Sequence, residues 1–275
     1  DFNYTLEFLN FERIYAGSQS DAITVLQDIQ RYIIRGGAGD DTLVIKSGAE
    51  IGGALIAGQI PYYDGQGGRD TLDYSDFTNP VVVDLSLGIA TGINNRAANS
   101  VINVENIIGG SGNDTLTGDQ GDNVLAGGLG NDMLTGLSGN DTYIFGDTVG
   151  TDTVVEASNA GTDTYDFSSA TAGLIFEINA ANLVVIGTGT SVTHTGLNIE
   201  NLIASQGADT FIFADTAIQN GSIDGQGGSD HLNFTAYSTR RDFFLTAIGA
   251  LDGFAGTVAG IVGGFENIDA ITGTA

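Results

Sequence analysis

The residues best placed to do chemistry in this chain are aspartates that recur at fixed intervals between residues 109 and 144. This stretch reads GGSGNDTLT, GDQGDNVLA, GGLGNDMLT and GLSGNDTYI, which are four copies in register of one nine-residue pattern. Glycines hold the first and fourth places, and the sixth place holds Asp114, Asn123, Asp132 and Asp141. Asp suits turns in general, but turn preference does not explain a fixed place. A short carboxylate beside glycine-rich backbone instead indicates a ligand for a hard cation.

The elements that position these aspartates follow from the same nine residues. Glycines in the first six places let the backbone adopt positive φ and turn tightly. The last three places form a short strand whose eighth residue points inward, and the seventh and ninth point outward. Two nonapeptides then make one coil of 18 residues, and the coils stack as parallel strands at about 4.8 Å. Applied to all 275 residues, this spacing predicts an all-β solenoid of about fifteen coils and about 70 Å. The predicted inward residues are Leu116, Leu125, Leu134 and Tyr143.

Stacking would align the aspartates along each edge of the solenoid. Turns on the same side are two repeats apart, so the spacing pairs Asp114 with Asp132 and Asn123 with Asp141. Ca²⁺ accepts six to eight oxygen ligands in irregular geometry, whereas Mg²⁺ demands a stricter octahedron. Several Ca²⁺ ions between the turns are therefore the expected cofactor. Asn123 offers only a neutral oxygen, and Asp119 or Asp122 would compensate there.

The composition favours an extracellular, calcium-binding chain. Acidic residues number 34 against 8 basic ones, giving a net charge of −26. Such a charge argues against a nucleic-acid partner and against attraction to anionic membranes. The absence of cysteine excludes disulfides and zinc–thiolate sites. Calcium would replace disulfides as the stabilising link, which predicts a secreted or cell-surface location.

The sequence carries no motif of a catalytic site, so we predict that the chain is not an enzyme. With two histidines and no H-E-x-x-H motif, it cannot build a zinc protease site. The segments GGSGN and GLSGN fail the G-x-S-x-G pattern at its last place. The apolar stretch 243–265 contains Asp252 and six glycines, so it indicates strands and turns rather than a membrane helix.

The repeats resemble the RTX, or hemolysin-type calcium-binding, family. The match is specific over 109–144 and good over 36–43, is looser at 65–72, 158–165, 204–211 and 225–232, and is weakest around Asp21 and Asp152. The resemblance implies a right-handed parallel β-roll that binds Ca²⁺ between its turns, folds after export and reaches the exterior by type I secretion. The ligands it implies, beyond those already named, are Gly110, Gly112, Gly128, Gly130, Gly37, Gly39, Asp41, Asp70, Asp163, Asp209, Asp230 and Asp152.

A longer period divides the chain into modules. The related phrases FERI at 11–14, VENI at 104–107, IENL at 199–202 and FENI at 265–268 mark their starts. The predicted modules are a degenerate one at 1–103, one at 104–198 with the four repeats, a third at 199–264 and a truncated one at 265–275. We expect the chain to be an excerpt of a longer repetitive protein. Residues 20–37 fit either a short helix or strands, and strands are favoured because Asp21-Ala22-Ile23 sits at a repeat position.

Three functions remain open at this point. The first is a calcium-stiffened structural segment of a large bacterial adhesin, surface layer or filament, with copies or neighbouring modules associating end to end. The second is a non-catalytic accessory module of a secreted hydrolase or polysaccharide epimerase. The third is adhesion to cell-surface glycans, for which the aromatic pairs Tyr62-Tyr63 and Phe243-Phe244 are candidates, although core packing is the favoured role for both pairs.

Overall fold

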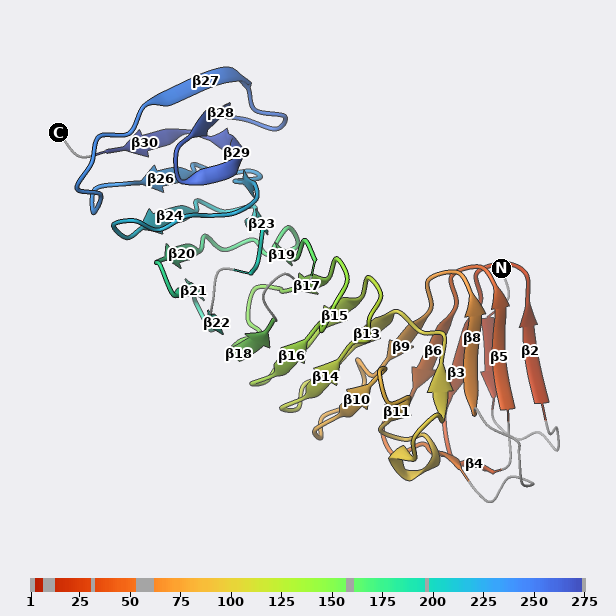
Figure 1. Ribbon diagram of the computed structural model, residues 1–275. Coiled ribbons are helices and arrows are strands. Elements are labelled where there is room, and N and C mark those ends of the chain that lie inside the picture. The colour runs from red at the N-terminus through yellow and green to blue at the C-terminus, as the bar shows by residue number, and fades with distance from the viewer. Residues whose placement is uncertain are drawn as a thin grey trace. The chain divides into compact units, whose positions relative to one another are not determined.

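The computed structural model describes residues 3–6, 13–30, 33–52, 62–156, 161–195 and 198–273. The chain divides into two compact units, unit 1 at 1–136 and unit 2 at 137–275. Each is built of short, mostly parallel strands (Figure 1). The all-β prediction is confirmed, since the described residues contain strands, turns and a single 3₁₀ turn, η1 (Asn94–Arg96).

Unit 1 contains two parallel sheets that the chain visits in turn. One has the order β1-β3-β6-β9-β13-β15. The other has the order β11-β10-β14-β16, in which β11 pairs antiparallel with β10 at the edge. A third, four-stranded parallel sheet has the order β12-β8-β5-β2, and β4 pairs with β7. The bounds are β1 Asn3–Leu6, β2 Arg13–Gly17, β3 Ala22–Val25, β4 Ile29–Gln30, β5 Ile33–Ala38, β6 Thr42–Ile45, β7 Ile51–Gly52, β8 Tyr63–Gly67, β9 Thr71–Asp73, β10 Val82–Asp84, β11 Ile89–Ala90, β12 Val101–Ile102, β13 Asn106–Ile108, β14 Thr115–Thr117, β15 Val124–Ala126 and β16 Met133–Thr135.

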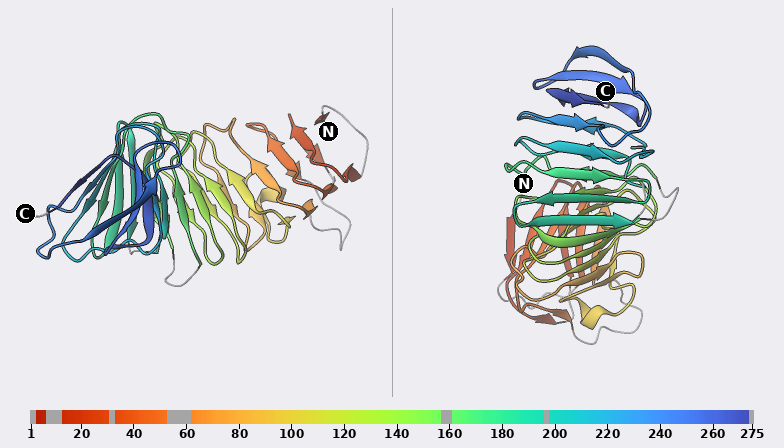
Figure 2. Two further views of the ribbon diagram at one scale, coloured as in Figure 1. Left: turned by 90° about the horizontal axis from the view of Figure 1, so that it is seen from above. Right: turned by 90° about the vertical axis from the view of Figure 1, so that its left-hand side faces the viewer.

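Unit 2 continues the same alternation with longer insertions. Its two sheets have the orders β17-β19-β23-β25-β29-β28-β27 and β18-β22-β21-β20-β24-β26-β30. Figure 2 shows the parallel strands of each unit from two further sides. The bounds are β17 Thr142–Ile144, β18 Gly150–Val155, β19 Thr164–Asp166, β20 Ile175–Ile178, β21 Asn182–Gly187, β22 Thr190–Thr195, β23 Asn201–Ile203, β24 Thr210–Phe213, β25 Ile223–Asp224, β26 His231–Asn233, β27 Phe243–Ile248, β28 Phe254–Val258, β29 Ile261–Ile268 and β30 Ala270–Thr272.

The nonapeptides have the predicted period. Ile107 of β13 pairs with Leu125 of β15, and Leu116 of β14 pairs with Leu134 of β16, each 18 residues further on. All four side chains are fully buried. A one-residue slip would move every such side chain to solvent, so the burial of the eighth place fixes the register. The parallel β-roll fold is thereby established from strand pairing and burial together.

The uniform 18-residue coil is wrong outside the perfect repeats. Strands β20, β21 and β22 pair antiparallel with their sequence neighbours, as do β27, β28 and β29. These segments lack the glycine-rich turn every nine residues, so the chain reverses through hairpins instead of passing to the other sheet. In unit 2 the core also changes from leucine to aromatic rings, such as Phe176 stacked on Phe211 with centroids 4.5 Å apart.

Three local expectations can be compared with the structure. Residues 20–37 form strands β3, β4 and β5 in their described part, as favoured. Residues 243–265 form β27, β28 and the start of β29, and no described helix is long and apolar enough to cross a membrane. Tyr62 and Tyr63 are buried, whereas Phe244 is 65% exposed. The FERI phrase falls partly outside the described residues, and the module boundaries remain predictions.

Candidate metal centre

Aspartates at the sixth place of successive coils are stacked through backbone amides. The amide of Asp114 donates to Oδ1 of Asp132 at 2.7 Å. The amide of Val81, one coil earlier, donates to Oδ1 of Asp114 at 2.8 Å. Both carboxylates are only 2% exposed. The structure therefore brings together the predicted pair Asp114 and Asp132 in a buried ladder, in which each acid receives an amide from the preceding coil.

A second ladder runs along the other series of turns in unit 1. The amide of Asp21 donates to Oδ1 of Asp41 at 2.8 Å, and the amide of Asp41 donates to Oδ1 of Asp70 at 2.8 Å. The amide of Asp70 then donates to Oε2 of Glu105 at 2.7 Å. A glutamate thus continues an aspartate ladder, and its longer side chain reaches the same amide.

Glu105 was not among the predicted ligands, although a signal for it existed. Glu105 directly precedes β13 as Asp70 directly precedes β9, and these strands pair with Asn106 opposite Thr71. The VENI phrase was interpreted only as a module marker. Aligning its acid–polar–apolar triplet with the D-T-L triplet of the repeats would have placed Glu105 among the ladder acids.

Unit 2 repeats this arrangement along one series of turns. The amide of Asp141 donates to Oδ1 of Asp163 at 2.9 Å, and the amide of Asp163 donates to Oε2 of Glu200 at 2.8 Å. Glu200 belongs to the IENL phrase and was missed for the same reason as Glu105. Asp141 and Asp163 are buried. Asn123, the predicted partner of Asp141, belongs to unit 1, and this pairing remains a prediction.

The other series of turns in unit 2 carries a ladder of three aspartates. The amide of Asp209 donates to Oδ1 of Asp230 at 2.8 Å, and the amide of Asp230 donates to Oδ2 of Asp269 at 2.9 Å. Asp269 precedes β30 in the triplet Asp269-Ala270-Ile271, which was not predicted from the sequence either. Asp152, which matched the repeat weakly, is buried within β18.

The first-place glycine leaves room for the carboxylate of its own repeat. A Cβ at Gly127 would lie 2.3 Å from Oδ2 of Asp132, and a Cβ at Gly36 would lie 2.3 Å from Oδ2 of Asp41. Both distances are far below van der Waals contact. A side chain at the first place would therefore push the acid out of the ladder, which explains why glycine and aspartate occur five residues apart.

Glycines at the second and fourth places bring backbone carbonyls against the next coil. Gly128 (φ +95°) faces the carbonyl oxygen of Gly110, and Gly130 (φ +126°) faces that of Gly112. A Cβ would lie 2.1 and 2.0 Å from these oxygens. The amide of Gly110 also donates to Oδ2 of Asp114 at 2.7 Å. Positive φ likewise occurs at the predicted glycines Gly37 and Gly39.

Asn123 occupies its sixth place as a neutral substitute. Its Oδ1 accepts the amide of Asp119 at 2.7 Å, and its Nδ2 donates to the carbonyl of Glu105 at 3.0 Å. Asp119 lies beside it and caps the amide of Gly121 at 2.8 Å. Asp122 is exposed. Asp119 is therefore the carboxylate closest to providing the charge that Asn123 lacks.

Burial disfavours the charged form of the ladder carboxylates, which makes them stronger bases than carboxylates in water. Desolvation by burial raises the pKa of Asp70 to about 7, and the charges of Asp41 and Glu105 add to the rise. Burial likewise raises the pKa of Asp230 to about 7 and those of Asp132 and Asp209 to about 6. An isolated buried carboxylate is costly, so these groups require a proton or a cation.

The donor set fits a calcium ion. Oδ2 of Asp41, Asp70 and Asp230 is buried and accepts no hydrogen bond from any described residue. Carboxylate and carbonyl oxygens are the ligands that Ca²⁺ prefers, and it tolerates the irregular geometry of a turn. The ladder acids and the neighbouring glycine carbonyls would hold the ion, and its charge would compensate the buried carboxylates.

Comparison with known families supplies the remaining observation. The model of the RTX calcium-binding nonapeptide repeat matches residues 33–48 and 107–143, in four copies. This chain carries RTX calcium-binding repeats. No curated protein matches it. The matched residues contain Asp41, Asp114, Asp132 and Asp141. Beyond them, Asp70 and Asp163 lie in ladders that contain matched acids, and Asp209 and Asp230 belong to a further ladder of the same kind. The ladder arrangement therefore extends beyond the matched residues.

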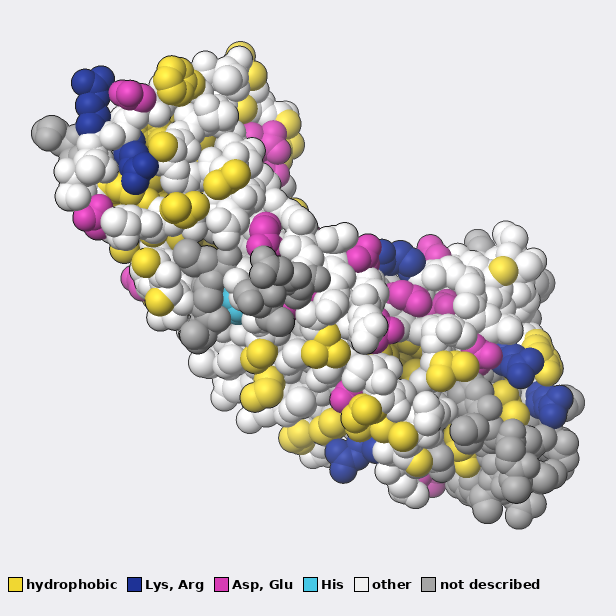
Figure 3. Space-filling view, viewed as in Figure 1, with side chains coloured by type: hydrophobic (Ala, Val, Ile, Leu, Met, Phe, Trp, Pro, Cys, Tyr) yellow, Lys and Arg dark blue, Asp and Glu magenta, His cyan; other side chains and the backbone are white. Residues whose placement is uncertain are grey.

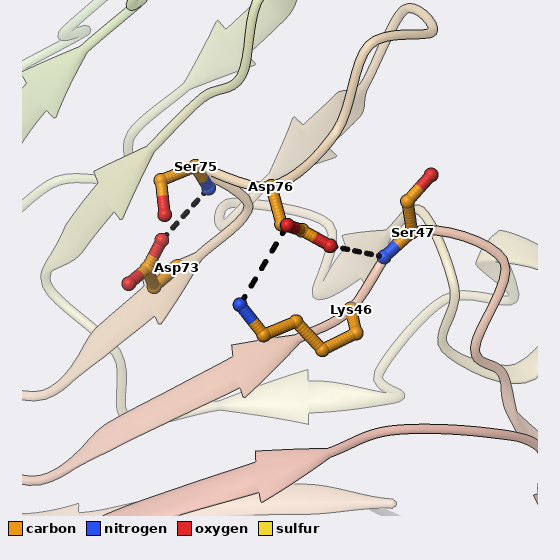
Figure 4. Close-up of polar contacts among 5 residues, drawn as sticks. All are labelled: Lys46, Ser47, Asp73, Ser75 and Asp76. Atoms are coloured by element: carbon orange, nitrogen blue, oxygen red, sulfur yellow. Dashed lines mark hydrogen bonds and ion pairs between the residues drawn. The ribbon is translucent and has the colours of Figure 1, made fainter.

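Two acidic residues outside the RTX ladders have ordinary partners. Asp76 lies 3.7 Å from the Lys46 ammonium and accepts the amide of Ser47 at 3.3 Å (Figure 4). Asp73 caps the amide of Ser75 at 2.8 Å in the same view. On the face drawn in Figure 3, acidic side chains form small separate groups rather than a continuous stripe. These surface acids are therefore weaker candidates for calcium ligands than the buried ladders.

Proposed function

We propose that this chain is a calcium-stiffened RTX segment of a large secreted or cell-surface bacterial protein, serving as an adhesin stalk, surface layer or filament. The observation that supports this proposal is the set of buried acid ladders, which join successive coils and whose ionised carboxylates a cation would stabilise. RTX calcium-binding repeats are the established part of this function. Secretion, by the type I route, fits the usual setting of such repeats and the absence of cysteine.

Calcium would stiffen the roll because each ion lies between turns that are already linked by amide–carboxylate bonds. Open sites of this kind are expected to bind with Kd of about 10⁻⁴ to 10⁻³ M, as in extracellular modules. Stacked sites share carboxylates with their neighbours, so folding should be cooperative along the roll. The transition would then occur between the low calcium inside a cell and the millimolar calcium outside.

Self-association is favoured by the far edge of unit 2. Strand β27 ends its sheet and pairs with β28 along one side. Phe244, Leu245 and Ile248 on this strand are 65%, 55% and 79% exposed. Figure 3 shows hydrophobic side chains over β27–β29. Exposed apolar residues on an edge strand are a typical contact between chains.

The test is circular dichroism with sedimentation velocity, first in calcium-free buffer and then with 5–10 mM CaCl₂, on the order of the range for weak extracellular sites. The proposal expects a large gain of β-structure on addition of calcium, and large particles only with calcium. Calcium-dependent folding to a monomer would favour the alternative, an accessory module of a secreted hydrolase or epimerase. Binding on a glycan array would favour adhesion. Identical structure with and without calcium would reject the calcium role.

A further inference from the structure

One residue outside the nonapeptide pattern approaches an RTX pair in unit 2. Glu156 directly follows β18, and its carboxylate oxygen lies with those of Asp141 and Asp163 in a group within 4.8 Å of one another. Asp141 is fully buried, Asp163 is 1% exposed and Glu156 is 8% exposed. Three carboxylates therefore converge in the interior at a place where the repeat alone provides two.

Two tyrosine side chains lie near this group of carboxylates. The Tyr143 hydroxyl donates to Oε1 of Glu156. Tyr165 is the register partner of Tyr143, with ring centroids 5.9 Å apart. Burial raises the pKa of Tyr165, and the charges of Glu156 and Asp152 add to the rise. The hydroxyl of Tyr165 is fully buried and has no hydrogen-bond partner in the described part of the chain.

These groups share the chemistry of a hard-cation site. Three carboxylates and a phenol oxygen are all oxygen donors, and no described histidine belongs to the group. The unpartnered Tyr165 hydroxyl is an available neutral ligand. Calcium affinity rises with the number of charged ligands. A site with three carboxylates should thus bind more tightly than a site with two.

We propose that Asp141, Glu156 and Asp163 form a calcium site of higher charge that fills before the RTX sites with two carboxylates. The inference rests on the proposed calcium-dependent folding of the chain. Early filling would fix the end of β18 against the turns of β17 and β19, so that unit 2 starts to fold around this ion.

Terbium luminescence can observe this site separately. Tb³⁺ replaces Ca²⁺ at oxygen sites, and its emission is sensitised by nearby tyrosine when the protein is excited. The chain has no tryptophan. The inward residues of the perfect repeats, Leu116, Leu125 and Leu134, provide no sensitiser there. Tyr63 near Asp70 contributes a separate emission signal. The emission from the site in unit 2 is therefore identified by comparing variants.

The whole chain is titrated with Tb³⁺ as wild type, Glu156→Gln and Glu177→Gln. Glu177 lies exposed on β20 and is the matched control for the same chemical change. We expect Glu156→Gln to weaken the tightest sensitised component by about tenfold or more, with Glu177→Gln unchanged. An unaltered titration of Glu156→Gln would overturn the proposal and indicate that the carboxylates share protons instead.

A second variant keeps the test decisive if Glu156→Gln does not fold. Tyr143→Phe combined with Tyr165→Phe should remove the tight emission component, while equilibrium dialysis still finds calcium bound. Persistence of that component in the double variant would place the tight site elsewhere. If wild type binds no Tb³⁺ at all, the proposed function fails, which is distinct from the failure of this one site.

Discussion

The amide of Asp114 and a carboxylate oxygen of Asp132 are 18 residues apart in the sequence and 2.7 Å apart in the structure. This contact serves two opposed roles. The hydrogen bond links one coil to the next, whereas burial of the acid disfavours its charged form. Calcium bound at this ladder would relieve the second effect without breaking the first. Mutation, pH and removal of the ion can separate the two contributions.

Asp132→Ala should destabilise unit 1 locally. It removes the acceptor of the Asp114 amide, and an unsatisfied buried donor costs about 1–3 kcal/mol. Hydrogen exchange in calcium should show faster exchange at β14 and β16 than in wild type, with β24 and β26 unchanged. Asp76→Ala is the matched control, because Asp76 is exposed, and should change stability by less than about 0.5 kcal/mol. Uniform loss of protection throughout the chain would contradict a local role.

Gly127→Ala should be destabilising by steric overlap. The added Cβ would lie 2.3 Å from Oδ2 of Asp132, and overpacking of this kind costs about 1–3 kcal/mol. Gly146→Ala is the control, because a Cβ there meets no atom within 4 Å. That change should be neutral or stabilising by up to about 1 kcal/mol. Urea denaturation of both variants in calcium compares them, and equal midpoints would rule out the steric explanation.

Without calcium, the protein should be more stable in mild acid than at alkaline pH. The pKa of Asp70 and Asp230 is raised to about 7, and that of Asp132 and Asp209 to about 6, from 3.8. An acid with a raised folded pKa binds more protons when folded, so its contribution declines as pH rises from about 4 through about 7. After calcium is removed on a chelating resin, the urea midpoint of the protein should decrease as the pH rises from 5 to 8.

Calcium should reverse this pH dependence. At pH 8 the ladder acids are ionised and bind the ion best, so added CaCl₂ should raise the urea midpoint more at pH 8 than at pH 5. A midpoint that rises with pH in calcium-free buffer would show that the ladder acids are stabilised as carboxylates by the protein alone.

Assembly should depend on the edge strand β27. Phe244→Ser with Ile248→Ser removes apolar contact area from exposed positions, so we expect smaller particles in sedimentation velocity with calcium. The calcium-induced circular dichroism change should be retained. Leu87→Ser, 55% exposed in unit 1, is the matched control. Undiminished particles in the double variant would locate the contact elsewhere.

The sequence predicted the parts of the site where periodicity is strict. Leu116 and Leu134 are buried in register as expected, because side chains alternate along a strand. Asp114 and Asp132 meet because the period of 18 residues is one coil. Where both the 18-residue period and the side-chain type are kept, the period alone predicts which residues stack on one another.

The missed residues share a physical reason. Glu105 and Glu200 reach their amides from a longer side chain, so they do not match a pattern written for aspartate. Glu156 directly follows β18 and approaches Asp141 from that position, which no short-range spacing encodes. The hairpins β20–β22 and β27–β29 likewise form through pairing between strands that carry no nonapeptide signal.

The ladder contact keeps its length while the chain between its partners varies. Separations of 18, 22, 29 and 37 residues all end in an amide–carboxylate bond of 2.7–2.9 Å. The acid thus restores the stacking register of the coils after each longer intervening segment. Loops and hairpins can be lengthened, exchanged or grafted between two rungs without propagating an error to the coils beyond, which makes the roll a tolerant frame for displaying inserted peptides.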